Sequence, residues 1–165
     1  MTLLSRKADY ALLILSYLYE RPGGGTARAI AEKLGLGLKQ AFIANILKEL
    51  CHHMFVASHR GVKGGYTLAR PAHTITLAEL LETIEDGVRL TVCNPGSHDH
   101  EECSLAGVCT VKGPIAVVHQ RLIEMLRSVT LAELFDPNGL ATQPSALRAL
   151  PLLAGCGSAE ETAPA

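Results

Sequence analysis

The apolar residues near the start of the chain recur every three or four positions. They follow Ser5, a residue type that commonly caps helices, and they stop at Pro22-Gly23-Gly24-Gly25. This spacing places one apolar stripe along one side of a helix, so it predicts an amphipathic first helix. The stripe consists of Ala8, Ala11, Leu12, Leu15, Leu18 and Tyr19.

Two shorter helices are predicted after the glycines. Thr26 is placed to cap a helix over Ala27–Leu34, and Gly35 ends that helix because glycine readily adopts the left-handed conformation. A Gly-Leu-Gly-Leu link then leads to a third helix over residues 39–51. Two short helices joined by so tight a turn are typical of a helix-turn-helix.

The third helix divides into two faces. Its apolar residues are expected to point inward: Phe42, Ile43, Ile46, Leu47 and Leu50. The outer face is small, polar and not acidic, with Lys39 at its start, followed by Gln40, Ala41, Ala44, Asn45 and Lys48. Amide side chains can make paired hydrogen bonds to adenine, and lysines can neutralise phosphates. The outer face therefore predicts a DNA recognition surface, with an ordinary solvent-facing helix as the alternative.

The stretch FVASHRGVKGGYTLAR has two β-prone runs around a glycine-rich centre and predicts a hairpin. Arg60 and Lys63 lie at its tip. A helix-turn-helix followed by a basic hairpin is the order of a winged helix, whose wing can enter the minor groove of DNA. The glycines lack the spacing of a nucleotide-binding phosphate loop, which argues against nucleotide hydrolysis.

A further helix is predicted over residues 77–86, because Thr76 and Glu79 form a capping-box pattern and Gly87 supplies a stop. A cysteine-containing stretch comes next. At the other end of the chain the composition turns to Ala, Pro, Gly and Ser, and we expect residues 137–165 to form a disordered tail.

A long helix opens at Gly113-Pro114. A narrow apolar seam at alternating steps of three and four residues suits packing against a partner helix. A two-fold symmetric DNA-binding protein can also contact two half-sites at once. We therefore expect a homodimer joined by this helix, with packing on the domain's own core as the alternative. Thr130 and Glu133 predict a short last helix that ends near Phe135. The seam consists of Ile115, Val118, Leu122, Met125 and Val129.

Charge is distributed unevenly, although the net charge is only -1. Residues 1–73 carry ten Lys or Arg against four Asp or Glu, a net +6, and residues 74–165 carry five against twelve, a net -7. A basic half suggests contact with a polyanion such as DNA. The residues predicted to contact DNA are Lys7, Lys39, Gln40, Asn45, Lys48, Arg60 and Lys63.

A chain of 165 residues can form one main domain with extensions. Arg6, Lys7 and Asp9 interrupt the opening before a long apolar run develops, so we expect neither a secretory signal nor a membrane span. The protein is expected to be cytoplasmic, where clustered cysteines are more often metal ligands or redox groups than disulfides.

Three of the five cysteines, Cys93, Cys103 and Cys109, lie in one stretch and are separated by nine and five residues. These gaps do not match the closely paired thiolates of a zinc ribbon. Three soft ligands on a loop with Gly and Pro suit an iron-sulfur cluster, 2Fe-2S or 4Fe-4S, whose fourth ligand comes from elsewhere. Zinc, or no metal at all, remains an alternative. Candidates for the fourth ligand are His98, His100, Glu101, Glu102 and Asp9.

The other two cysteines are expected to have no part in this site. Cys51 lies near the end of the third helix, beside two histidines, and is expected to be a packing residue. Cys156 lies in the predicted tail, where it is expected to be incidental.

The blocks LSRKADYALLILSYL, IAEKLGLGLKQAFIANILKEL, VASHRGVKGGYTLARP and ITLAELLETIE are followed by three cysteines and a long helix. Over about residues 1–135 the chain resembles the bacterial winged-helix iron-sulfur regulators typified by IscR, NsrR, RirA and CymR. The resemblance implies a mainly α fold with a small β-hairpin wing and a long dimerisation helix. It also implies a homodimeric transcription regulator and, in members with three cysteines, a cluster whose assembly, redox state or loss changes DNA affinity.

The resemblance carries over to particular positions. The three loop cysteines match the cluster cysteines, residues 39–48 match the recognition helix, and Arg60 matches the wing arginine. Lys112 stands where IscR-like members have a histidine ligand, whereas Asp9 matches the aspartate that NsrR-like members supply from the partner subunit. Asp9 is therefore the expected fourth ligand. Ala41 and Ala44 replace more polar family residues, so the operator sequence does not transfer.

The expected organisation is a winged-helix DNA-binding domain over residues 1–87 and a cluster-binding loop over residues 88–112. A dimerisation helix and a short helix over residues 113–136 precede the tail. The expected function is sequence-specific repression of transcription, controlled by a cluster that senses redox, nitric oxide or iron status. The alternatives are a cluster-free regulator that answers to a partner protein and a zinc-stabilised interaction module. No residue pattern supports an enzyme.

Overall fold

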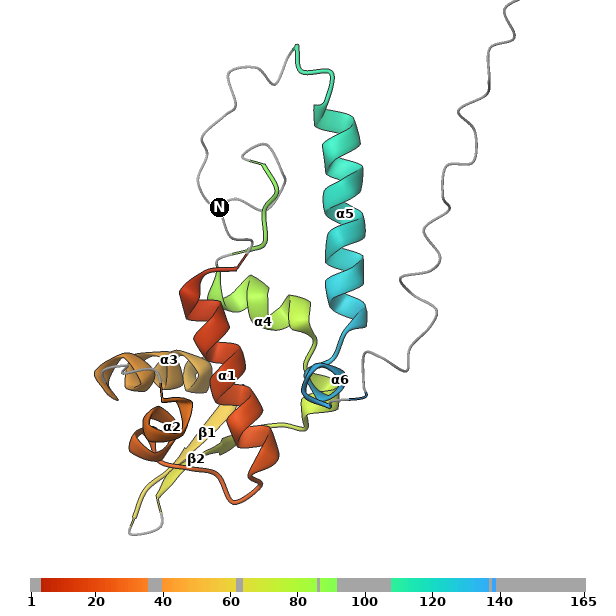
Figure 1. Ribbon diagram of the computed structural model, residues 1–165. Coiled ribbons are helices and arrows are strands. Elements are labelled where there is room, and N and C mark those ends of the chain that lie inside the picture. The colour runs from red at the N-terminus through yellow and green to blue at the C-terminus, as the bar shows by residue number, and fades with distance from the viewer. Residues whose placement is uncertain are drawn as a thin grey trace, which may run out of the picture.

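A computed structural model describes residues 4–35, 40–61, 64–85, 87–91, 108–136 and 138 of the protein (Figure 1). The described part is mainly helical with one two-stranded antiparallel hairpin, as the winged-helix prediction requires. In chain order its elements are α1 Arg6–Glu20, α2 Ala27–Leu34, α3 Gln40–His52, β1 Val56–His59, β2 Gly65–Leu68, the 3₁₀ helix η1 Ala72–Thr74, α4 Leu77–Ile84, α5 Lys112–Ser128 and α6 Leu131–Phe135.

Helix α1 lies at the centre of the winged helix, where it contacts α2, α3, α4, α6 and β2. Ser5 caps it as predicted, because the Ser5 Oγ accepts a hydrogen bond from the Ala8 N–H at 3.3 Å. The prediction that Tyr19 belongs to the inward-facing stripe is wrong. It is 38% exposed, and its ring lies 5.7 Å from that of Phe135. Position 19 lies past the edge of the buried stripe, which includes Ile14 instead.

Helices α2 and α3 form the helix-turn-helix. The Thr26 Oγ1 accepts a hydrogen bond from the Ala29 N–H at 3.1 Å, and Gly35 ends α2 with a φ of 60°. The prediction that Phe42 points inward is wrong, because Phe42 is 37% exposed. It lies at the edge of the α3 stripe, where its ring meets the Tyr10 ring of α1. The buried residues of α3 are Ile43, Ile46, Leu47 and Leu50.

The hairpin is joined to α1 through the glycines that precede α2. Val56 pairs with Leu68 in the hairpin. The Gly25 N–H donates to the Tyr66 carbonyl at 3.0 Å, and the Tyr66 N–H donates back at 2.9 Å. A Cβ on Gly25 would lie 2.7 Å from the Tyr17 ring, so only glycine fits there. These glycines therefore do more than stop a helix: they let the wing pack close to α1.

Backbone hydrogen bonds join the segment that precedes α4 to the segment between α5 and α6. The Leu77 N–H donates to the Val129 carbonyl at 2.8 Å, and the Leu131 N–H donates to the Ile75 carbonyl at 2.9 Å. This pairing fixes the base of α5 against the start of α4. Helix α4 ends at Ile84, two residues earlier than predicted.

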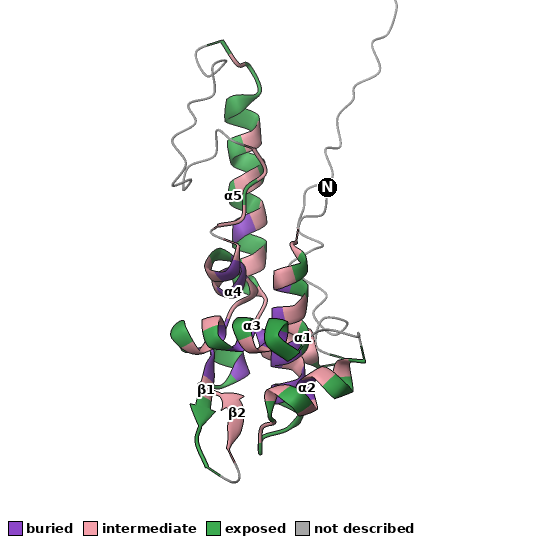
Figure 2. Cartoon of the chain, turned by 90° about the vertical axis from the view of Figure 1, so that its left-hand side faces the viewer, coloured by how far each residue is buried: buried purple, intermediate pink, exposed green. Residues whose placement is uncertain are grey.

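Helix α5 rises away from the winged helix and packs on α4 near its base (Figures 1 and 2). Within α5 only Ile123 is buried. Val118 is 52% exposed and Met125 is 39% exposed, while Ile115 and Leu122 are half-buried. The predicted seam is therefore partly open to solvent in the single chain.

Candidate functional site

The outer face of α3 is presented to solvent as the sequence predicts. Gln40, Ala41, Asn45 and Lys48 are exposed, and Ala44 is half-buried between them. The opposite face packs on α1 and α2, which hold the helix in place. A rigid helix with exposed amide, small and basic residues can enter a major groove and contact base edges. Lys39, predicted to lie beside this face, is outside the described residues.

Arg60 is exposed directly after β1, at the predicted wing tip. Gly61 follows it with a φ of 116°, a conformation that glycine adopts readily. The Gly64 N–H donates to the Gly61 carbonyl at 2.8 Å, and a Cβ on Gly64 would lie 2.6 Å from the His59 carbonyl oxygen. The turn thus depends on both glycines and projects Arg60 outward. Lys63 lies outside the described residues.

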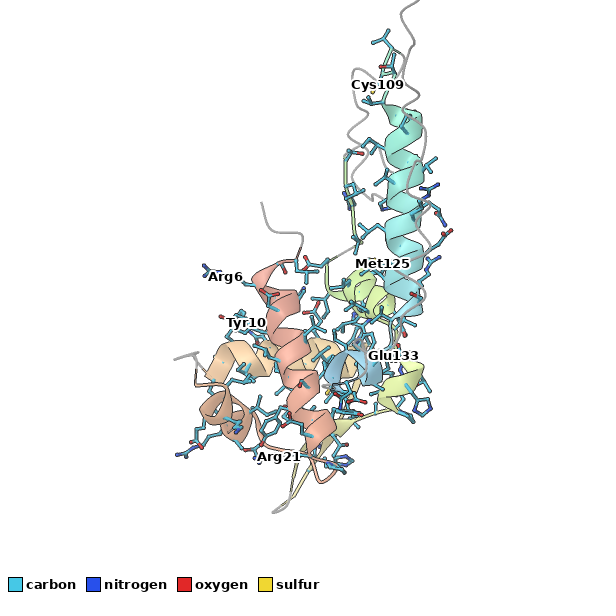
Figure 3. All side chains as sticks on the ribbon, turned by 45° about the vertical axis from the view of Figure 1, so that its right-hand side comes forward. Arg6, Tyr10, Arg21, Cys109, Met125 and Glu133 are labelled. Carbon is cyan, nitrogen blue, oxygen red and sulfur yellow. The ribbon has the colours of Figure 1, made fainter. Side chains whose placement is uncertain are left out.

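Lys7 is half-buried, and its Nζ lies 2.8 Å from the Glu49 Oε1 of α3. The ion pair connects α1 to α3, and the contact of Lys7 with DNA stays a prediction. The neighbouring Arg6 is exposed instead (Figure 3). Within the winged helix the Lys7–Glu49 pair therefore links α1 to the predicted recognition helix.

The base of the wing carries an arginine that sequence reasoning missed. Arg70 forms an ion pair with Glu79 of α4, and its guanidinium lies 5.1 Å from the centre of the Phe55 ring. The Arg70 Nε is buried and has no hydrogen-bond partner in the described part of the chain. Arg70 therefore links the end of the hairpin to α4. The only sequence signal was an arginine directly before Pro71.

Cys109 is half-buried and lies three residues before α5. Cys93 and Cys103 lie outside the described residues, so the convergence of the three thiols stays a prediction. Among the described residues no group of three His, Cys, Asp or Glu side chains is placed to hold a metal ion. The chain entering the loop is nevertheless fixed to α5, because the His119 Nε2 lies 2.8 Å from the Val88 carbonyl oxygen.

Asp9 is exposed on α1 and lines a shallow hollow of about 520 Å³ between α1 and α6. Figure 3 places Cys109 at the end of α5 that lies away from Arg6 and Tyr10 of α1. Asp9 and Cys109 of one chain therefore do not share a site. The other residues that line the hollow are Leu12, Leu13, Ser16, Leu134 and Phe135.

Cys51 is half-buried at the end of α3 and packs against the hydrophobic core, in agreement with its predicted packing role. Burial raises the pKa of the Cys51 thiol above its ordinary value. The protonated thiol is thereby favoured over the thiolate that would bind metal.

Comparison with known proteins identifies the family to which this architecture belongs. Residues 4–137 match the Rrf2 family, described as iron-dependent transcriptional regulators. The chain belongs to the Rrf2 family. Members of this family are transcription regulators, which agrees with the predicted class, and the resemblance to IscR and CymR is confirmed.

Individual relatives agree with this assignment. Over 96 residues the Rrf2 chain is 34% identical to MT1325 of Mycobacterium tuberculosis (strain CDC 1551 / Oshkosh), whose name describes an HTH-type transcriptional regulator. The match covers 58% of this chain and 59% of that protein, so the chain spans less than two thirds of the relative's length.

Solved structures share the Rrf2 fold. The global cysteine regulator CymR of B. subtilis is 23% identical with a TM-score of 0.62, and the match covers 82% of this chain and 97% of CymR. IscR of T. potens is 22% identical with a TM-score of 0.61, over 88% of this chain and 94% of IscR. These likenesses establish the winged-helix architecture. None of the helices in the described part of the chain combines the length and apolar character that a membrane span requires.

Proposed function

We propose that the protein is a sequence-specific DNA-binding transcription regulator, a repressor, whose operator affinity is controlled by an iron-sulfur cluster. The observation that carries the proposal is the joint exposure of the α3 outer face and Arg60 on one winged helix of a chain in the Rrf2 family. Helix α3 would read a major groove, and Arg60 would enter the adjacent minor groove. Such a regulator would act in the cytoplasm and would catalyse no reaction.

The DNA-binding unit would be a homodimer joined through α5. Val118 and Met125 leave apolar surface exposed along α5, whose packing against the winged helix is with α4 near its base. Pairing two such helices removes apolar surface from water and is the contact that a seam of this spacing favours. Two-fold symmetry would then present two recognition helices to half-sites about 34 to 36 Å apart.

The cluster would be held by Cys93, Cys103 and Cys109, with the Asp9 carboxylate of the partner subunit as fourth ligand. The donor set fits in kind, because thiolates are the common ligands of iron-sulfur clusters. Asp9 is exposed, and Figure 3 shows Arg6 and Tyr10, which lie on either side of it in the sequence, away from Cys109 of the same chain, which supports a ligand supplied to the other subunit. When bound, the cluster would supply a centre whose ligation changes with oxidation, nitric oxide or iron supply.

The chain offers a direct route from this loop to DNA. Cys109 precedes α5, and His119 of α5 holds the Val88 carbonyl at the start of the same loop. Both ends of the loop are therefore tied to α5, and α5 is tied to α4 at its base. A change in thiol ligation would tilt α5 and alter the separation of the two recognition helices, which weakens both contacts together.

The decisive experiment combines spectroscopy with a gel shift. Anaerobically purified protein is expected to be coloured and to contain iron and sulfide. Replacing Cys93, Cys103 and Cys109 together by Ala is expected to abolish the colour and to change affinity for the operator. Cys51→Ala, which removes a packing thiol, is the matched control and should leave both properties unchanged.

Two other outcomes would change the proposal. A colourless protein that binds DNA equally well with and without the loop cysteines would favour a cluster-free regulator that responds to a partner protein. Zinc found in place of iron and sulfide would favour a structural metal site.

The fourth ligand has its own test. Asp9→Ala is expected to shift the visible spectrum of the bound cluster and to hasten its loss in air, while the iron content after anaerobic reconstitution stays near that of the unaltered protein. The control is Glu20→Ala, which removes an exposed carboxylate from the other end of α1. An unchanged spectrum for Asp9→Ala would assign the fourth position to another group.

A further inference from the structure

Phe42 is a partly exposed aromatic residue that packs against another aromatic ring at the surface. It is the third residue of α3 and is 37% exposed. Its ring centre lies 5.3 Å from that of Tyr10, with the two ring planes at 85°. Edge-to-face contact of this kind is a favoured arrangement of aromatic rings, so Tyr10 restricts the orientations open to Phe42.

Tyr10 is a firm support for this contact. It belongs to α1, is half-buried and packs against the hydrophobic core. Figure 3 labels Tyr10 where α1 passes α3. The ion pair between Lys7 and Glu49 holds the same two helices together. Phe42 is therefore a braced apolar group at the edge of the recognition face, next to Ala41 and one helical turn before Asn45.

We propose that Phe42 reads a thymine by contact with its 5-methyl group. Among the four bases only thymine presents an apolar group in the major groove, and Phe is one of the side chains that meets it. The proposal rests on the proposed DNA-binding function and adds a determinant of sequence preference. The polar residues of the same face, Gln40 and Asn45, cannot detect that methyl group by hydrogen bonding.

The test uses duplexes selected from a random DNA pool with the full-length protein. In the best-bound duplex each thymine is replaced in turn by deoxyuridine, which removes the methyl group and keeps the Watson–Crick pair. We expect the protein to lose about fourfold in affinity at one thymine in each half-site, because burial of one apolar carbon is worth about 0.8 kcal/mol. Phe42→Ala is expected to bind the thymine duplex about as weakly as the protein binds the deoxyuridine duplex, and to show no further loss with deoxyuridine.

Two variants serve as checks. Phe42→Leu keeps an apolar side chain, so it should retain part of the methyl preference even if the alanine variant folds poorly. Tyr19→Ala removes an equally exposed aromatic residue of another ring pair, between α1 and α6, and should retain the full preference.

The outcomes separate this inference from the function on which it rests. An equal deoxyuridine penalty in the protein and in both Phe42 variants would overturn the role of Phe42, as would the absence of any such penalty. Failure to select any duplex would overturn the DNA-binding function itself.

Discussion

At the scale of single residues, the surroundings of Cys51 determine how readily its thiol ionises. Cys51 packs against the core, and burial raises the pKa of its thiol. Desolvation opposes formation of the thiolate, which is the reactive form. The folded state therefore holds the Cys51 proton more tightly than the unfolded state does. Its contribution to stability is present below the ordinary thiol pKa and is lost as the pH rises through the raised value.

This difference predicts slow alkylation of Cys51. At a pH of about 8 a thiol of raised pKa exposes less thiolate than a free cysteine, so iodoacetamide should modify Cys51 more slowly in the folded protein than in urea. The rate should rise as the pH is increased toward the raised pKa. Peptide mapping by mass spectrometry measures the modified fraction. Equal rates in folded and unfolded protein would contradict the packing role.

Arg60 supplies a second prediction at this scale. If it enters the minor groove, Arg60→Ala should weaken operator binding by about 1 to 3 kcal/mol, measured by fluorescence anisotropy on a selected duplex. Lys112→Ala is the control, because Lys112 is exposed at the start of α5, away from the wing (Figure 1). If Arg60→Ala loses no more operator affinity than Lys112→Ala does, Arg60 contributes only nonspecific charge and does not contact the minor groove.

At the scale of elements, polar residues of α4 and of its C-cap connect α4 to three other parts of the fold. Glu79 pairs with Arg70 at the base of the wing, and the Glu82 Oε1 lies 3.3 Å from the Arg127 Nη2 of α5. The Glu85 Oε1 accepts a hydrogen bond from the Ser5 N–H at 2.8 Å. Three glutamates spaced three residues apart thus join α4 to the hairpin, to α5 and to the start of α1.

The Glu85 contact should contribute measurably to stability. The Ser5 amide is partly buried and precedes α1, so its loss of a charged acceptor in Glu85→Ala should lower the free energy of unfolding by about 1 to 2 kcal/mol. Glu32→Ala is the control, since it breaks only the exposed ion pair with Arg28 and should cost less than about 0.5 kcal/mol. Urea unfolding followed by circular dichroism makes the comparison. Equal losses would show that the Glu85 contact is no stronger than a surface pair.

The starts of four helices were predictable from the sequence because N-caps are local. Ser5, Thr26, Thr76 and Thr130 each accept a hydrogen bond from the N–H three residues on. The capping box at Thr130 is complete. At Thr76 the Glu79 carboxylate pairs with Arg70, a distant partner that the local pattern does not contain. Contacts of that kind are decided by packing.

At the scale of the whole molecule, the exposed seam of α5 makes the assembly testable. A charge placed in an apolar interface loses hydration without gaining a partner. Val118→Lys should therefore weaken the proposed homodimer by at least about tenfold, equivalent to roughly 1.4 kcal/mol. Sedimentation velocity over a range of concentrations measures the change in the dimer dissociation constant. Gln120→Lys introduces the same charge on the same helix and is the matched control, because Gln120 bonds only to Glu124 of its own helix among the described contacts. Equal behaviour of the two variants would place the interface elsewhere.

The sequence by itself determined the winged-helix fold and the positions of its helices, because periodicity, caps and glycines act over a few neighbouring residues. It also supplied the exposed face of α3 and the wing arginine. Only the tertiary structure decided that Lys7 pairs with Glu49, that Gly25 packs against Tyr17, and that Phe42 rests on Tyr10 outside the core. Each of these contacts joins two different segments of the fold. Their partners depend on how helices and hairpin pack in space, which no local pattern encodes.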